Sequence, residues 1–80
     1  GGIECVSVDL RLIFQTALLA NASCFIICHN HPSGNLQPSN GDRNLTRTIH
    51  EAGKLLNIML IDHIIVTSEG YYSFSDNGIL

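Results

Sequence analysis

The sequence predicts an α/β domain in which a mixed sheet is flanked by helices, in the order strand, helix, strand, loop, helix, strand, strand. Short runs rich in β-branched residues alternate with two longer segments whose apolar residues recur at helical spacing. Residues that favour turns gather in one long loop between them. A chain of 80 residues with 45% hydrophobic and 14% charged residues fits one folded domain and excludes a disordered segment.

The first half of the chain predicts a strand, a helix and a second strand. Residues 3–8 alternate weakly between apolar and polar positions, as a short strand does. Asp9 is the expected N-cap of an amphipathic helix over residues 10–20, and Asn21 is its expected stop. Residues 24–28 form a continuous apolar run, typical of a strand buried on both faces. This order implies a right-handed crossover between two parallel strands.

The second helix is expected after a loop over residues 29–38. Ser39 and Asp42 resemble a capping box that uses Asp in place of Glu. The helix is expected to end near Asn57. Its apolar stripe consists of Leu45, Ile49, Ala52 and Leu56.

The last third of the chain predicts a β-hairpin. Residues 58–67 are rich in β-branched side chains and indicate a buried strand. Residues 68–70 favour a turn, residues 71–74 favour the partner strand, and residues 76–78 favour a closing turn.

Charge and cysteine content exclude several classes of protein. The net charge is −3, and the four Lys and Arg residues are scattered, which argues against direct nucleic-acid binding by this segment. The apolar runs are far shorter than the roughly 20 residues of a membrane-spanning helix. Cys24 and Cys28 lie among bulky apolar residues, as reduced thiols do, so we expect a cytoplasmic protein. The oligomeric state has no signature in the sequence.

Three residues around the long loop have the chemistry of a metal site. His29 and His31 are separated by one residue where a strand ends, so strand alternation can place both imidazoles on the same side. Asp42 follows in the first turn of the next helix, where the helix dipole favours a carboxylate. Two imidazoles and one carboxylate suit Zn²⁺ and leave one tetrahedral position for water, as in catalytic zinc sites.

The same residues also allow other interpretations. The two histidines can be ordinary loop residues, and Ser39 and Asp42 can serve only as a helix cap, although different oxygens of one carboxylate can cap and bind. A rival zinc site could use Cys24, Cys28 and His29, but alternation places His29 on the opposite face from the cysteines. A purely structural metal site would need a fourth protein ligand.

A longer motif connects these residues to a known family. His29-x-His31-Pro32, six further residues and then Ser39-x-x-Asp42 resemble the HxHPx6SxxD core of the JAMM motif in MPN-type metalloproteases. The resemblance to the RadC family in particular covers essentially all 80 residues and is clearest over residues 29–35, 51–56 and 62–65.

The resemblance implies a zinc-dependent metallohydrolase of the peptidase or isopeptidase type, acting on a peptide or protein substrate. It implies that His29, His31 and Asp42 bind zinc, and that the Ser39 hydroxyl positions or stabilises the oxyanion. Family members also use a glutamate from an upstream strand as general base. Glu4 is a weak match for it, because the base is expected farther upstream.

We therefore expect the 80 residues to be the C-terminal part of a RadC-like JAMM/MPN domain that lacks its N-terminal strands and is inactive without the upstream glutamate. The alternative function is a non-enzymatic scaffold or DNA-repair-associated module of the MPN type, and the complete ligand set argues against it. Asp62 and His63 can form a pair that orients a metal ligand, but the pattern favours the alternative, in which one of them faces solvent and the other bonds locally to the backbone. His50 is expected on the solvent side of its helix.

Overall fold

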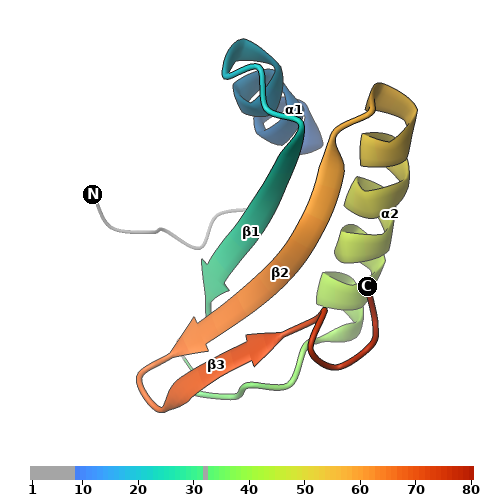
Figure 1. Cartoon of the computed structure of the whole chain (residues 1–80). Coiled ribbons are helices and arrows are strands. Elements are labelled where there is room, and N and C mark those ends of the chain that lie inside the picture. The colour runs from blue at the N-terminus through green and yellow to red at the C-terminus, as the bar shows by residue number, and fades with distance from the viewer. Residues whose placement is uncertain (1–8, 32) are drawn as a thin grey trace.

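A three-stranded mixed sheet with two helices forms the described part of the chain, residues 9–31 and 33–80, in a computed structural model (Figure 1). Strand β1 pairs in parallel with β2, and β2 pairs antiparallel with β3. The elements are α1 (Leu10–Leu19), β1 (Cys24–Asn30), α2 (Asn40–Leu56), β2 (Met59–Thr67) and β3 (Gly70–Ser73). The α/β class is confirmed, while the strand expected over residues 3–8, and the crossover that depends on it, lie outside the described residues.

Helix α1 begins and ends as its sequence predicts. The Asp9 carboxylate accepts a hydrogen bond from the Arg11 N–H at 2.9 Å, which confirms the N-cap. Asn21 adopts a left-handed conformation with φ of 54° directly after the helix and confirms the stop. The sequence of α1 predicts an apolar stripe of Leu10, Ile13, Phe14, Ala17 and Leu18, of which Phe14 and Ala17 are buried but Leu18 is 55% exposed. Neither α1 nor α2 is long and apolar enough to cross a membrane.

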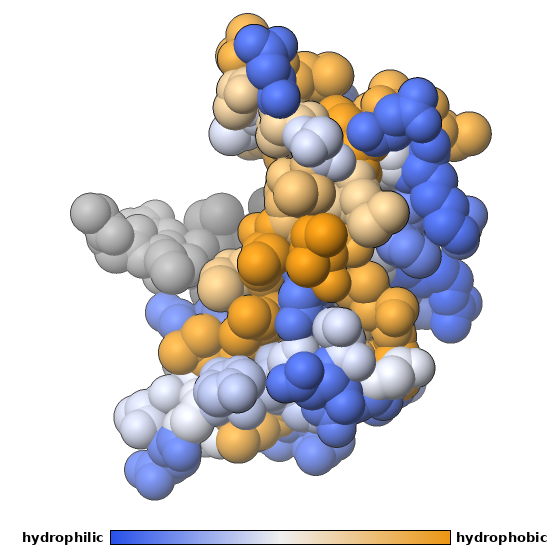
Figure 2. Space-filling view, viewed as in Figure 1, coloured by the Kyte–Doolittle hydropathy of each residue, from blue (hydrophilic) through white to orange (hydrophobic). Residues whose placement is uncertain are grey.

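Strand β1 differs from its prediction in two respects. It continues to Asn30, so His29 belongs to the strand and not to the loop. It is also not buried on both faces, since Ile26 is 55% exposed and the free thiols of Cys24 and Cys28 are exposed. The reason is its place at one edge of the described sheet, with α2 packed beside β2. Figure 2 shows the resulting apolar surface over the strands, with hydrophilic residues along α2.

Helix α2 has the predicted ends, and three residues of its predicted stripe, Leu45, Ile49 and Ala52, lie in or against the core. The capping box of Ser39 and Asp42 is present, and Asn57 ends the helix in a left-handed conformation with φ of 57°. The buried residues are Thr46, Ile49 and Gly53, whereas Leu56 is 46% exposed. Gly53 allows close approach of the next segment, because a Cβ there would lie 2.3 Å from the Ile58 carbonyl oxygen.

A bulge in β2 decides which of its side chains face α2. Phe25 pairs with Leu60 and the next residue of β1 pairs with Asp62, so Ile61 is the extra residue. An extra residue reverses the alternation of the strand beyond it. His63 and Ile65 therefore join Leu60 on the face that packs against α2, and all of them are at most 1% exposed.

The core has two adjoining parts. One consists of Phe14, Ala17, Ile49, Ile58 and Leu60, where α1, α2 and the sheet meet. The other surrounds His63, whose ring stacks on Phe74 with centroids 4.5 Å apart and planes 8° apart. A histidine thus takes the place of an apolar residue in the packing beneath α2.

Candidate metal centre

The side chains of His29, His31 and Asp42 converge where the carboxyl end of β1 meets the first turn of α2. One ligand atom from each lies within 4.8 Å of the others. The two imidazole centroids are 4.7 Å apart, which confirms that strand alternation places both rings on the same side. The three predicted metal ligands are therefore brought together.

The Asp42 carboxylate uses its two oxygens differently. Oδ2 accepts the Ser39 backbone N–H at 2.8 Å and lies 3.1 Å from Nε2 of His31. Oδ1 lies 3.5 Å from Nε2 of His29. Burial raises the pKa of Asp42, but its hydrogen bonds with Ser39 and the nearby histidines outweigh burial and hold that pKa below its usual value. The residue can therefore cap α2 and present an ionised oxygen to a cation at the same time.

His31 faces hydrogen-bond acceptors at both ring nitrogens. Its Nδ1 lies 2.7 Å from the Asn35 carbonyl oxygen, which can only accept, so Nδ1 carries a proton. Its Nε2 then has a lone pair when the ring is neutral, and this lone pair faces Oδ2 of Asp42 at 3.1 Å. Two electron-pair donors in such contact require a proton or a metal ion between them.

His29 has its tautomer set by a chain of hydrogen bonds that starts at the Asp42 backbone. The Thr46 hydroxyl donates its single proton to the Asp42 carbonyl at 2.7 Å, so it must accept from Nδ1–H of His63 at 2.5 Å. Nε2 of His63 is then an acceptor, and it lies 2.7 Å from Nδ1 of His29. His29 therefore carries its proton on Nδ1, and its Nε2 lone pair faces the Asp42 carboxylate.

The buried ring of His63 is neutral at pH 7, as this chain of bonds requires. Burial, together with the nearby ring of His29, lowers the pKa of His63 to about 4. Burial also lowers the pKa of His29. Within the described chain, no buried side-chain nitrogen or oxygen lacks a hydrogen-bond partner, so the network around His63 is complete.

The three side chains form a group that could hold a metal ion, with one ligand atom of each within 4.8 Å of the others. Two ligands that each lie about 2.1 Å from a tetrahedral ion are roughly 3.4 Å apart. The distances from Asp42 oxygens to Nε2 of His29 and of His31 are 3.5 and 3.1 Å. Among residues 9–31 and 33–80, the only cluster of His, Cys, Asp and Glu that could hold a metal is this one, so the rival cysteine site does not form there.

Other predicted residues lie around the centre. The exposed Ser39 hydroxyl accepts the Asp42 N–H at 3.0 Å and keeps its own proton for donation. Glu4 lies outside the described residues.

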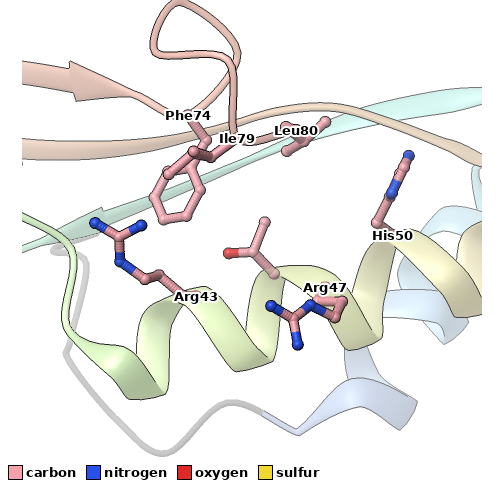
Figure 3. A pocket seen from close by; sticks show the side chains of 7 residues that line it. Arg43, Arg47, His50, Phe74, Ile79 and Leu80 are labelled. Atoms are coloured by element: carbon pink, nitrogen blue, oxygen red, sulfur yellow. The ribbon is translucent and has the colours of Figure 1, made fainter.

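His50, expected on the solvent side of α2, is half-buried and lines a pocket of about 210 Å³ with Arg43 and Arg47 (Figure 3). No metal ligand lines that pocket, whereas His31 borders a second hollow of about 360 Å³.

The family described as the RadC-like JAB domain matches residues 1–79. The chain belongs to this family. It is 48% identical over 79 residues to a UPF0758 protein of Flavobacterium johnsoniae, and 49% identical over 70 residues to one of Thermotoga maritima. A UPF0758 protein of Porphyromonas gingivalis is 44% identical over 81 residues. These alignments cover 99%, 88% and 100% of the RadC-like chain but 34%, 32% and 36% of the relatives, so it spans about a third of their length.

The RadC-like domain also contains a contact that its sequence indicated only in part. The sequence left open whether Asp62 and His63 orient a ligand, and of the two only His63 contacts a candidate ligand, His29. Asp62 accepts hydrogen bonds from the Ser73 hydroxyl and from the backbone N–H of Ser75. Thr46 was not singled out, although a threonine one helical turn after Asp42, in line with a buried isoleucine, is a detectable signal.

Proposed function

We propose that this domain holds the zinc ion of a hydrolase that cleaves amide or isopeptide bonds in peptide or protein substrates. The observation that carries the proposal is the convergence of three electron-pair donors, Nε2 of His29, Nε2 of His31 and the Asp42 carboxylate, whose oxygens lie 3.5 and 3.1 Å from the two nitrogens. Both histidines carry their proton on Nδ1, the ring nitrogen that points away from the Asp42 carboxylate. Membership of the RadC-like JAB domain family supports the same chemistry.

Each residue of the site has a role in this chemistry. Zinc bound here would polarise the substrate carbonyl and lower the pKa of a water molecule toward about 7. The Ser39 hydroxyl donates a hydrogen bond to the carbonyl oxygen as negative charge develops on it. An upstream glutamate takes the proton of the attacking water and passes it to the leaving amine. The hollow beside His31 leaves space for the substrate next to the ligands.

The zinc site is tested by measuring metal content and affinity in the purified chain. We expect the unmodified chain to retain about one zinc ion per molecule after dialysis, and the His31→Ala and Asp42→Ala variants to lose it. His50→Gln is the matched control, because this histidine lies on α2 but outside the ligand cluster. Equal and negligible zinc in all four proteins would overturn the proposal.

Hydrolysis is tested on a longer protein that includes the upstream strands of the domain. We expect it to cleave a model isopeptide only with zinc present and only with the upstream glutamate intact. A protein that binds zinc tightly but cleaves no isopeptide or peptide would instead support the scaffold or DNA-repair-associated alternative.

A further inference from the structure

We infer that His63 is a positioning residue of the metal centre: its Nε2 accepts the Nδ1–H of His29 and directs the other ring nitrogen of His29 at the ion, while Thr46 orients His63 in turn. The inference rests on the proposed metal site but not on hydrolysis.

The carbonyl oxygen of Asp42 determines which group donates and which accepts in every hydrogen bond of this series. The carbonyl oxygen of Asp42 can only accept, so the Thr46 proton points to it at 2.7 Å. Each later bond then has a single allowed direction, through His63 to His29. This series of hydrogen bonds starts at the backbone carbonyl of Asp42 and ends at His29, whose ring faces the Asp42 carboxylate. One residue of α2 thus determines both the ligand oxygen and the tautomer of the facing histidine.

The packing around His63 restricts its ring to one orientation. The side chain is 1% exposed, stacks on Phe74 and lies 4.8 Å from His29 between ring centroids. The bulge at Ile61 brings it to the inner face of the sheet. Metal-bound histidines usually donate their second N–H to a carboxylate, a carbonyl or water, and removal of that acceptor typically weakens metal binding 10- to 100-fold. Here a second, neutral imidazole is the acceptor.

The tautomer is tested first in metal-free protein, by correlating the ring nitrogens of His29 with their protons in ¹⁵N NMR spectra. We expect the unmodified chain to carry the His29 proton on Nδ1, and His63→Leu to shift it partly or wholly to Nε2. In His63→Gln the amide oxygen can still accept from Nδ1–H, so the proton is expected to stay there. An unchanged His29 tautomer in His63→Leu would overturn the inference.

Zinc affinity is then measured by competition with a chromophoric chelator. We expect His63→Leu to bind zinc about 10- to 100-fold more weakly and His63→Gln to recover most of the loss. Ile65→Val is the control for packing, because this buried neighbour lies on the same face of β2 but bonds to no ligand. Equal losses in His63→Leu and His63→Gln would show a packing effect and overturn the inference.

If His63→Leu does not fold, a second pair of variants, Thr46→Val and Thr46→Ser, tests the same role of His63. Thr46→Val preserves the shape of the side chain but removes the hydroxyl that holds Nδ1–H of His63. We expect a smaller loss of zinc affinity and a mixed His63 tautomer, both reversed in Thr46→Ser. No change of either quantity in Thr46→Val would contradict the inference. If the unmodified chain binds no zinc, the proposed function fails, while the NMR result on metal-free protein still decides the role of His63.

Discussion

The Thr46 hydroxyl lies between the Asp42 carbonyl, to which it donates, and Nδ1 of His63, from which it accepts at 2.5 Å. Thr46 is only 3% exposed, so water does not compete with its hydroxyl for either hydrogen bond. Helix α2 therefore contributes the candidate ligand Asp42 from its first turn. From its second turn it contributes Thr46, which holds the ring of His63 in place. The predictions below test how far the stability and the chemistry of the domain depend on this end of α2.

Removal of the Ser39 hydroxyl is expected to affect both stability and activity. In Ser39→Ala the Asp42 N–H loses its capping acceptor, which costs about 1 kcal/mol of unfolding free energy, measured by urea denaturation. If a longer protein that includes this domain cleaves the model isopeptide, we also expect its kcat to fall about 100-fold or more in Ser39→Ala, because a donor to the oxyanion is lost. Ser39→Thr keeps both functions and is the control. Normal kcat in Ser39→Ala would show that this residue is only a cap.

Gly53→Ala is expected to destabilise the domain, although alanine is the better helix former by about 1 kcal/mol. The added Cβ would lie 2.3 Å from the Ile58 carbonyl oxygen, so the backbone after α2 must move. Overpacking of this kind costs about 1 to 3 kcal/mol, measured by urea denaturation. Gly41→Ala is the matched control, because its Cβ would meet only the Ser39 side chain, at 3.6 Å. Similar stabilities of the two variants would contradict the close contact.

Zinc removal is expected to lower the melting temperature of the domain. A ligand that binds only the folded chain stabilises it by about 2.7 kcal/mol when its free concentration is 100 times Kd. Thermal unfolding should therefore shift upward with added zinc and return with a chelator. His31→Ala should show no such shift, since it removes a ligand without disturbing the capping box. A zinc-dependent shift of equal size in this variant would place the bound metal elsewhere.

Asp62 is expected to contribute stability that disappears in acid. Burial raises its pKa, but hydrogen bonds from Ser73, Ser75 and the His63 N–H outweigh burial, so its pKa lies below the usual value for an aspartate. The unfolded chain therefore binds this proton first as the pH falls, and the contribution is present above about pH 4 and lost through the lower, folded pKa. The unfolding free energies of the unmodified chain and Asp62→Asn should differ at pH 7 and converge toward pH 2. A difference that does not vary with pH would contradict this role.

Local signals predicted the ends of the helices and the ligand set. Asp9, Ser39 and Asn57 act within a few residues of chain, so their roles follow from residue type and spacing alone. The histidine pair is equally local, since alternation in one strand places both rings together. The helix caps and the histidine pair can therefore be predicted without knowing which segments pack against them.

The remaining features depend on contacts between distant segments. The burial of Gly53 depends on the close approach of the Ile58 carbonyl, and the exposure of Leu56 depends on what packs beside the end of α2. The contact between His63 and His29 joins residues 34 positions apart and arises from the pairing of two strands. Ile61 could not be identified as an extra residue, because a bulge is defined by the partner strand and not by its own sequence.

The extra residue in β2 also determines the electrical character of the proposed centre. With Ile61 in ordinary register, alternation counted from Leu60 would turn Asp62 inward, so a carboxylate would stand behind the His29 ring where His63 now lies. A divalent ion balanced by one carboxylate keeps a net charge of +1, whereas two carboxylates would neutralise it. An ion that keeps its positive charge attracts electrons more strongly from a bound carbonyl. In the proposed centre, the single extra isoleucine of β2 would thereby keep the charge of the bound ion positive.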